Sequence, residues 1–411
     1  MVNRPKNPKS EIRRETVFNK LTVEDIDLAG KKVLMRVDFN VPLQQGQVVD
    51  DYKIKAALPT INYCLQQGAS LILMSHLGRP KGRECDKYSL MPAAKRLGEL
   101  LNQEVLMISD CVGEEARREL EEMAPGGVAL LENLRFYEEE EKNDPAFSQE
   151  LAALADLYVN DAFGTAHRAH ASTVGVTKYF AQAAAGFLMK SEFEHMETVR
   201  TDPERPLVAI IGGAKISTKL KEIKILLTKV DTLLLGGGMS FTFLKAQGMP
   251  VGNSLVEEDM IEEAGLILEQ AKERGVPLVF PFDSVIVRSI DSPAERRIVP
   301  EDGILEGWIG VDIGPVTITE FGQVIQEART IIWNGPVGIF EVPEFARGTE
   351  EIARLVANCS AKSIVGGGES AAAIIKLGLQ DKISHISTGG GASLEFLEGK
   401  ELPGITALTD K

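Results

Sequence analysis

The sequence contains little cysteine and no long apolar run, and each absence excludes a class of protein. Four cysteines in 411 residues are scattered without a CxxC pair, so neither a disulfide framework nor a zinc site is predicted. No uninterrupted apolar segment reaches the length of a membrane span. Scattered free thiols are typical of a reducing compartment, and we predict a cytoplasmic protein.

The chain also lacks the basic excess of a nucleic-acid-binding protein. Lys and Arg number 45 against 60 Asp and Glu, a formal net charge of −15. If such an acidic protein binds anionic ligands, it must gather its cations locally. Basic residues are frequent in the first twenty positions, but no apolar segment accompanies them to form a secretory signal. We predict that residues 1–20 are a disordered basic leader.

Short apolar runs alternate with helical patterns along the chain. The runs are nearly continuous in apolar residues, as in strands of parallel sheets that are covered on both faces. In the first half these runs lie at 31–37, 70–75, 105–108, 128–133 and 156–161. In the second half they lie at 207–211, 232–238, 277–282, 330–335, 363–368 and 382–391. The predicted fold class is α/β with two doubly wound sheets.

A change in this pattern near residue 200 indicates two domains. Residues 184–201 have the composition of one helix, and the polar, proline-containing segment TDPERP (201–206) follows it. We therefore predict a first lobe over 21–185, a connecting helix over 186–200 and a second lobe that begins at residue 201.

Glycine-rich turns end four of the six strands predicted in the second half. Such turns let the backbone approach a ligand and point amides at a phosphate, although packing alone is the alternative. The chain has no GxxxxGK[ST], and its GxGxxA match at 366–371 lacks the acidic strand end of a dinucleotide site. Several separate loops would then hold a mononucleotide.

Two further features of the second half fit a nucleotide site. Lys215 and Lys219 share one face of a predicted helix near its positive N-terminus, where anions bind. Glu341 either binds ribose hydroxyls or caps a helix.

Polar and basic side chains follow the strands of the first half. Asp38 and Asn40 have the same side-chain parity after the first strand, so both can face one cavity. The loops after the later strands carry His76, Arg79, Arg135, His167, Arg168 and His170. Arginine binds phosphate or carboxylate with two parallel hydrogen bonds. These residues predict a site for a small phosphorylated acid, and with the nucleotide loops they predict a small-molecule kinase.

Eleven motifs occur in the order found in the phosphoglycerate kinase family, which the chain resembles from about Lys31 onward. They are RVDFNVP, AALPTI, SHLGRP, KYSLMPAAKRL, LLENLRF, NDAFGTAHRAH, GGAKISTK, GGGMSFTFLK, WNGPVGIFE, VGGGES and STGGGASLEFLEGKELPG. The resemblance implies two Rossmann-like lobes joined by a hinge helix, each a mostly parallel sheet covered by helices. It also implies that the second lobe covers 201–386 and that the tail, 387–411, returns to the first lobe.

The resemblance further implies a reaction and its site residues. The reaction is the reversible, Mg²⁺-dependent transfer of a phosphoryl group between 1,3-bisphosphoglycerate and ADP, which gives 3-phosphoglycerate and ATP. The enzyme would be a monomer without nucleic-acid or membrane partners. The implied substrate-binding residues are Asp38, Phe39, Asn40, Lys53, His76, Leu77, Gly78, Arg79, Arg135 and Arg168. The implied nucleotide-binding residues are Gly213, Lys215, Lys219, Gly237, Gly310, Asn334, Glu341, Gly367, Gly368, Glu369 and Ser370. The implied catalytic residues are Lys53, Lys215, Arg168 and Gly390, and the implied metal ligand is Glu369.

Two positions depart from the family's pattern. Lys53 stands where the family usually has an arginine, so we expect lower activity because lysine lacks the planar fork. Glu369 stands where the family has the aspartate that binds magnesium, and its longer arm must retract or shift the ion. Ser370, in place of the common threonine, is a milder change. Two alternatives stay open: a catalytically weakened homologue that acts as a nucleotide-binding or interaction protein, and a kinase for a different carboxylic acid.

Overall fold

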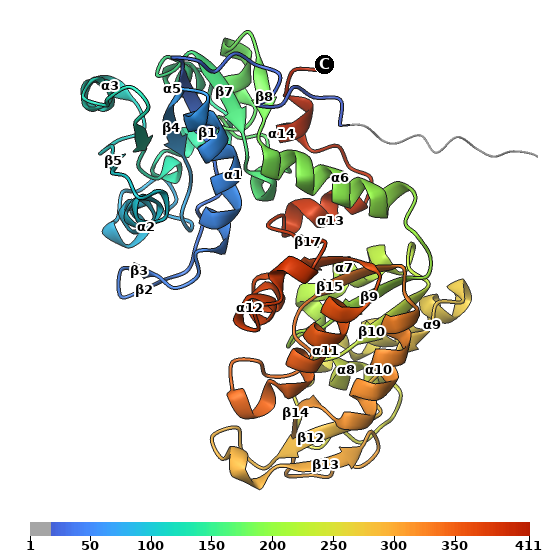
Figure 1. Ribbon diagram of the computed structural model, residues 1–411. Helices are drawn as coiled ribbons and strands as arrows, with labels where there is room; N and C mark the ends of the chain where they lie inside the picture. Colours follow the sequence, from blue (N-terminus) through green and yellow to red (C-terminus); the bar gives the residue numbers. More distant parts are fainter. Residues whose placement is uncertain (1–17) are drawn as a thin grey trace, which may run out of the picture.

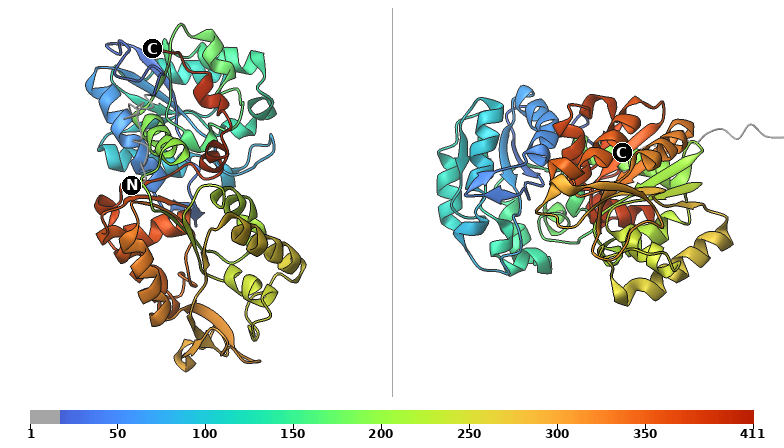
Figure 2. Two further views of the ribbon diagram at one scale, coloured as in Figure 1. Left: turned by 90° about the vertical axis from the view of Figure 1, so that its right-hand side faces the viewer. Right: turned by 90° about the horizontal axis from the view of Figure 1, so that it is seen from below.

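The structure, a computed structural model, describes residues 18–411 of the chain (Figure 1). Two lobes, each built on a parallel sheet, lie one above the other, and the connecting helix and the C-terminal segment lie between them (Figures 1 and 2). This arrangement confirms the predicted α/β fold class. Most of the predicted leader lies outside the described residues. Within them, no helix combines the length and the apolar character needed to cross a membrane.

The first lobe contains a parallel sheet with the strand order β5-β6-β4-β1-β7-β8. Its strands are β1 (Lys32–Arg36), β4 (Ser70–Met74), β5 (Val105–Met107), β6 (Val128–Leu130), β7 (Leu157–Asn160) and β8 (Ala183–Ala185). Its helices are α1 (Tyr52–Gln66), α2 (Met91–Leu101), α3 (Gly113–Glu121), α4 (Glu138–Lys142) and α5 (Pro145–Ala152). Arg36, the last residue of β1, pairs with Met74 of β4 and Asn160 of β7. The loops after these three strands therefore leave the sheet at one edge.

The second lobe repeats this plan with the strand order β11-β10-β9-β15-β16-β17. Its strands are β9 (Leu207–Ile211), β10 (Thr232–Leu235), β11 (Leu278–Val279), β15 (Thr330–Asn334), β16 (Lys362–Gly366) and β17 (His385–Ile386). Its helices are α7 (Ile216–Leu226), α8 (Met239–Ala246), α9 (Ile261–Arg274), α10 (Pro315–Glu327), α11 (Arg347–Asn358) and α12 (Gly368–Lys376). Asn334 pairs with Ile211 and Gly366, so the glycine-rich loops after these strands also share an edge.

The structure differs from the predicted elements in two places. The pattern predicts a strand over 277–282, but β11 covers only Leu278–Val279, because Pro277 and Pro281 on either side lack the N–H that a ladder needs. The chain then enters a small antiparallel sheet that the sequence did not predict. Its strands, in the order β13-β12-β14, are β13 (Arg297–Pro300), β12 (Asp283–Val287) and β14 (Ile309–Ile313). The pattern also predicts a helix from residue 184, but that segment starts as strand β8, which pairs with β7.

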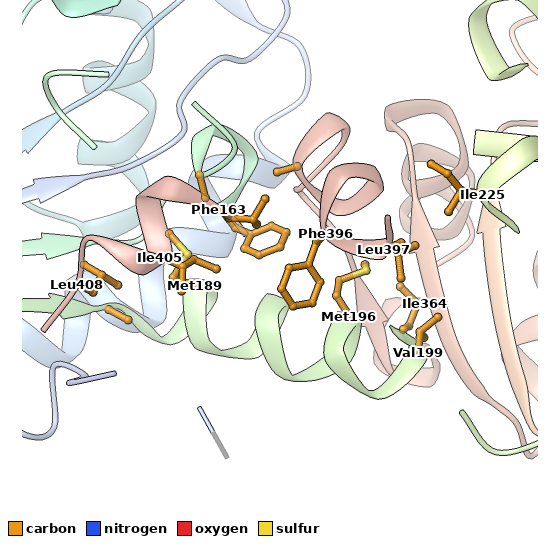
Figure 3. Packing of buried hydrophobic residues seen from close by; sticks show 14 of the residues in the cluster. Phe163, Met189, Met196, Val199, Ile225, Ile364, Phe396, Leu397, Ile405 and Leu408 are labelled. Atoms are coloured by element: carbon orange, nitrogen blue, oxygen red, sulfur yellow. The ribbon is translucent and has the colours of Figure 1, made fainter. Parts of the chain in front are cut away.

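Helix α6 (Phe187–Thr201) connects the lobes, and the C-terminal segment packs along it (Figure 3). This segment forms α13 (Gly391–Leu397) and α14 (Pro403–Thr406). The ring of Phe396 lies 5.2 Å from that of Phe193 on α6, centroid to centroid. Farther on, the N–H of Gly404 donates to the carbonyl of Ala166 at 2.8 Å, and the last residues hydrogen-bond to β8. The end of the chain thus contacts the first lobe.

Asp161 is a buried carboxyl group between β7 and the start of α6. Its Oδ1 accepts the N–H of Met189 at 3.1 Å, whereas its Oδ2 has no hydrogen-bond partner among the described residues. Burial raises the pKa of Asp161 from its ordinary value of 3.8 to about 6. The folded state therefore binds this proton more tightly than the unfolded chain. The resulting stabilisation is complete below about pH 4 and is lost as the pH rises through about 6.

We expect Asp161→Asn to remove this pH dependence, because the amide keeps the acceptor for Met189 and cannot ionise. Relative to the parent, the free energy of unfolding of the variant should increase by up to about 3 kcal/mol between pH 4 and pH 7. Urea unfolding at the two pH values measures it, with the exposed Asp202→Asn as the control. Equal shifts in both variants would contradict the assignment.

Candidate active site

A cavity of about 280 Å³, here called the cationic cavity, opens at the edge of the first sheet where the strands end. The sequence-predicted residues that line it are Asp38, Asn40, Lys53, His76, Gly78, Arg79, Arg135, His167, Arg168 and Gly390. They come from several loops and helix α1 of the first lobe, together with the turn at the start of the tail. The structure therefore brings together side chains that are up to 130 positions apart within the first lobe, from Asp38 to Arg168.

Asp38 is the anion at the centre of these cations. Its Oδ2 lies 2.7 Å from Lys53 Nζ, and its Oδ1 lies 3.9 Å from His76 Nδ1. Burial alone would raise the pKa of Asp38, but the charge and hydrogen bond of Lys53, together with the charge of Arg36, outweigh it and lower the pKa to about 2. Asp38 is therefore ionised at neutral pH and fixes the ammonium group of Lys53.

Arg36, which was not predicted as a site residue, is buried beneath the cationic cavity and contacts His76. Its side chain is fully buried, and its Nε donates to Ser172 Oγ at 2.9 Å. Its Nη2 lies 3.2 Å from His76 Nδ1. Burial lowers the pKa of His76 well below its usual value, so the ring is neutral and Nδ1 can accept from Arg36. The other ring nitrogen, Nε2, then carries the proton and can donate to a ligand.

Two arginines face the same cavity and repel each other. Arg135 is held by its Nη1, which donates to the carbonyl of Gly78 at 2.8 Å, and by its Nε, which lies 3.2 Å from Glu141 Oε1. Burial, helped by the charge of Arg168, lowers the pKa of Arg135 to about 10. An anion bound between the two guanidinium groups would relieve this repulsion.

A second cavity, of about 500 Å³ and here called the glycine-lined cavity, lies at the corresponding edge of the second sheet. The sequence-predicted residues that line it are Gly213, Gly237, Gly310, Glu341 and Glu369. Most of its other lining is apolar, for example Leu255, Ile309 and Val337. Such a cavity suits a flat, largely apolar group with a charged end.

Gly237 shows why this edge needs glycine. Its φ is +70°, and a Cβ there would lie 2.6 Å from the carbonyl oxygen of Gly213. Its N–H donates to the carbonyl of Val337 at 3.0 Å, so three loops meet backbone to backbone. Any side chain at this position would separate the loops.

Lys219 and Asn334 lie beside the glycine-lined cavity, not in its wall. Lys219 Nζ donates to Asn334 Oδ1 at 2.7 Å, and Asn334 Nδ2 donates to Glu222 Oε1 at 2.7 Å. Asn334 and Gly367 line a neighbouring space of about 30 Å³ that also reaches Gly390. This small space links the loops of the second lobe with the Gly389–Gly391 turn.

Other predicted residues line neither of the two main cavities. Lys215 is exposed at the N-terminus of α7, and Gly368 is the first residue of α12. Ser370 is buried, and its Oγ accepts the N–H of Gly335 at 2.7 Å. Phe39 and Leu77 belong to the hydrophobic core of the first lobe. The side chains of these last three support the loops, so their predicted contacts with ligands would be made by the backbone and stay predictions.

Glu341 and Glu369 place two carboxylates at one end of the glycine-lined cavity. Burial, together with the negative charge of Glu341, raises the pKa of Glu369. A cation at this point would relieve the repulsion, and carboxylate oxygens are ligands that Mg²⁺ accepts. Among residues 18–411, no group of three or more His, Cys, Asp or Glu could hold a metal ion. Glu341 and Glu369 therefore fit a metal ion that is bound mainly by the phosphate oxygens of a nucleotide.

Sequence reasoning also missed a buried network at the junction of the lobes. The carboxylate of Glu192, on α6, accepts from Ser387 Oγ and Thr388 Oγ1, each at 2.8 Å. It also lies 2.8 Å from His385 Nε2. The hydroxyl of Tyr52, at the start of α1, donates to the carbonyl of Ile386 at 2.6 Å. The helix that carries Lys53 is thereby tied to the strand that leads into the Gly389–Gly391 turn.

Comparison with known proteins identifies similar chains. A family model described as "Phosphoglycerate kinase" matches residues 23–400. A phosphoglycerate kinase of Clostridium botulinum (strain Hall) is 54% identical over 396 residues, which are 96% of this chain and 100% of that protein. One from Dictyoglomus turgidum is 58% identical over 392 residues, which are 95% and 98% of the two chains. The solved phosphoglycerate kinase of Coxiella burnetii has a TM-score of 0.80 at 41% identity, and the match covers 94% of this chain and 98% of that one.

Proposed function

The chain belongs to the phosphoglycerate kinase family, and we propose that its two cavities are the two substrate sites of that reaction. The chain is a kinase that transfers a phosphoryl group between 1,3-bisphosphoglycerate and ADP, a reaction of glycolysis. The observation that carries the assignment of the sites is the composition of the cationic cavity. Its wall combines the cations of the first lobe with the Gly389–Gly391 turn at the start of the tail, which directly follows the last strand of the second lobe. A group held there faces both lobes.

The cationic cavity binds the phosphoglycerate. Arg135 and Arg168 both line the cavity and carry the charge to hold an anionic group, and the protonated Nε2 of His76 offers a further donor. The amide of Asn40 accepts the N–H of Gly78 at 2.9 Å, which fixes the loop that carries Arg79. Lys53 forms an ion pair with Asp38 and is the neighbour of Tyr52, whose hydroxyl contacts the second lobe. Lys53 therefore lies at the end of α1 that is nearest to the second lobe.

The glycine-lined cavity binds the nucleotide. Its apolar wall suits the base, and Glu341 suits the hydroxyls of a ribose. Lys219, Asn334 and the turn that contains Gly367 then lie toward the phosphates. We propose that Glu369, beside Glu341, holds the Mg²⁺ of the Mg–nucleotide. When bound, Mg²⁺ supplies positive charge to the phosphate oxygens.

The absence of a general base in this proposal has a chemical reason. In the direction that consumes ATP, the nucleophile is a carboxylate of 3-phosphoglycerate, which is already ionised at neutral pH. Catalysis then requires alignment and positive charge on the transferring oxygens. Lys215 provides a donor from the second lobe, the amides at Gly390 and Gly391 provide donors from the start of the tail, and Lys53 and Arg168 provide them from the first lobe. Approach of the lobes would exclude water, which protects the acyl phosphate from hydrolysis.

We also propose the organisation and setting of the enzyme. The first lobe comprises residues 21–185, the connecting helix 186–200, the second lobe 201–386 and the returning tail 387–411. Support for the tail comes from the hydrogen bonds of Gly404 and Thr409 to the first lobe. The scattered thiols favour the cytoplasm, and we propose that the enzyme acts there as a monomer without nucleic-acid or membrane partners.

A coupled assay with ATP, 3-phosphoglycerate and Mg²⁺ tests the proposal. We expect turnover that requires all three. Folded protein that binds ADP but gives no turnover above background would contradict it and favour a weakened homologue.

Glu369→Gln tests the magnesium ligand separately. We expect the variant to need about tenfold more Mg²⁺ for half-maximal activity, because a neutral amide is a weaker ligand than a carboxylate. Titration calorimetry gives a second readout: Mg²⁺ should strengthen ADP binding less in the variant than in the parent. Glu344→Gln, an exposed carboxylate outside the glycine-lined cavity, is the matched control. An unchanged Mg²⁺ requirement would remove Glu369 from the metal site, whereas Glu369→Asp should reduce the requirement below that of the parent.

A further inference from the structure

A third space, here called the interlobe groove, runs between the two lobes outside both ligand cavities. It has a volume of about 600 Å³. Its first wall is made by the hairpin of β2 (Leu43–Gln44) and β3 (Gln47–Val48), with the residues that follow it, and by α2. Its second wall is made by α12 of the second lobe. In Figure 1 the hairpin extends below the first lobe to the level of α12. None of the predicted site residues lines this groove.

The two walls carry exposed aliphatic side chains that have no cover. Val49, just after the hairpin, is 57% exposed, and Ile375 of α12 is 37% exposed. Both line the interlobe groove, from opposite lobes. Exposed aliphatic surface is unfavourable in water, so contact between the two side chains would be favourable.

Each wall of the groove is continuous with a helix that carries a proposed site residue. On the first wall, Asp50 and Asp51 lead directly into α1, whose second residue is Lys53. On the second wall, α12 begins at Gly368 and Glu369, and Ile375 lies about 9 Å along the same helix. A movement that narrows the interlobe groove therefore moves the helix of Lys53 and the helix of Glu369 toward each other. Closing the groove would therefore also narrow the space between the two substrates.

We propose that Val49 and Ile375 form a hydrophobic latch that holds the lobes together during phosphoryl transfer. The inference rests on the proposed function, because it requires the substrates of the two lobes to be brought into contact. Both residues are positioning residues: they touch neither substrate, and they act by stabilising the closed arrangement. Because each substrate binds to one lobe, the latch contributes to kcat and to the closed complex, and not to the binding of either substrate alone.

The test uses Val49→Ser, Ile375→Ser and the double variant. The matched control is Val316→Ser, at a valine that is 52% exposed and lies outside the interlobe groove. We expect each single variant to lower kcat about fivefold, with unchanged dissociation constants for ADP alone and for 3-phosphoglycerate alone. The double variant should be little worse than either single one, since both remove one contact. Small-angle scattering should show that 3-phosphoglycerate and Mg-ADP together compact the parent and the control more than the latch variants.

The outcomes separate the latch from the proposed function. Equal compaction and equal kcat in the latch variants and in Val316→Ser would overturn the latch while leaving the kinase assignment intact. Additive losses in the double variant would also overturn it, because they would show two independent effects. Absence of turnover in the parent chain would instead contradict the proposed function.

Discussion

Replacing Lys215 by alanine should lower kcat by about a thousandfold and leave the affinity for ADP nearly unchanged. Lys215 is exposed at the N-terminus of α7 and lines neither of the two substrate cavities. Its ammonium is therefore free to reach a group that passes between the lobes. Removing a preorganised group that stabilises the negative charge of the transition state lowers kcat by a factor of about 10² to 10³. The effect falls on kcat because the contact is made in the transition state and not with bound ADP.

The control for this variant is Lys224→Ala on the same helix, whose ammonium pairs with Glu263 at 2.5 Å. It removes one positive charge from α7 without touching the site, so kcat should change less than twofold. Lys215→Arg should keep part of the parental rate, because arginine carries the same positive charge on a side chain of different length and shape. Steady-state kcat and KM with calorimetric ADP binding measure all three variants. A Lys215→Ala enzyme with more than a tenth of the parental kcat would show that other groups carry the charge.

The sequence predicted the fold and the strand-end location of the site because both depend on local patterns. Continuous aliphatic runs marked the buried parallel strands, and the loops at their carboxyl ends necessarily share one edge of each sheet. Asp38 and Arg168 could therefore be placed near each other without tertiary information. The antiparallel sheet escaped prediction because its strand β13 is largely exposed and lacks an apolar face. Short edge strands of this kind are defined by pairing and not by composition.

Other residues could be assigned only from tertiary contacts. Arg36 ends an aliphatic strand, and its role follows from its contacts with Ser172 and His76. Glu192 lies on a connecting helix whose polar residues would ordinarily face water, yet the returning tail buries it. The burial of Phe39 could be predicted from the sequence, because the alternation that turns Asp38 toward the cationic cavity turns Phe39 into the core.

Removing the side chain of Lys53 should be the second largest loss, about a hundredfold in kcat/KM. Lys53 Nζ forms the 2.7 Å ion pair that keeps Asp38 ionised in a buried place. Lys53→Ala removes a cation from the cationic cavity and leaves the carboxylate without its partner, and an unpaired buried charge is costly. Both effects weaken the binding of an anionic substrate, so KM for 3-phosphoglycerate should rise as kcat falls.

Lys53→Arg should act in the opposite direction and raise kcat severalfold above that of the parent. A single ammonium that is held by Asp38 has little freedom to contact a second anion, whereas a guanidinium can bind Asp38 with one edge and present N–H donors to the transferring group with the other. Lys55→Arg makes the same exchange two residues away, at a side chain that pairs with Asp51 and is 51% exposed, and it should leave kcat unchanged. Equal kcat values for the parent, Lys53→Arg and Lys55→Arg would mean that the fork contributes nothing here and that a point charge beside Asp38 is sufficient.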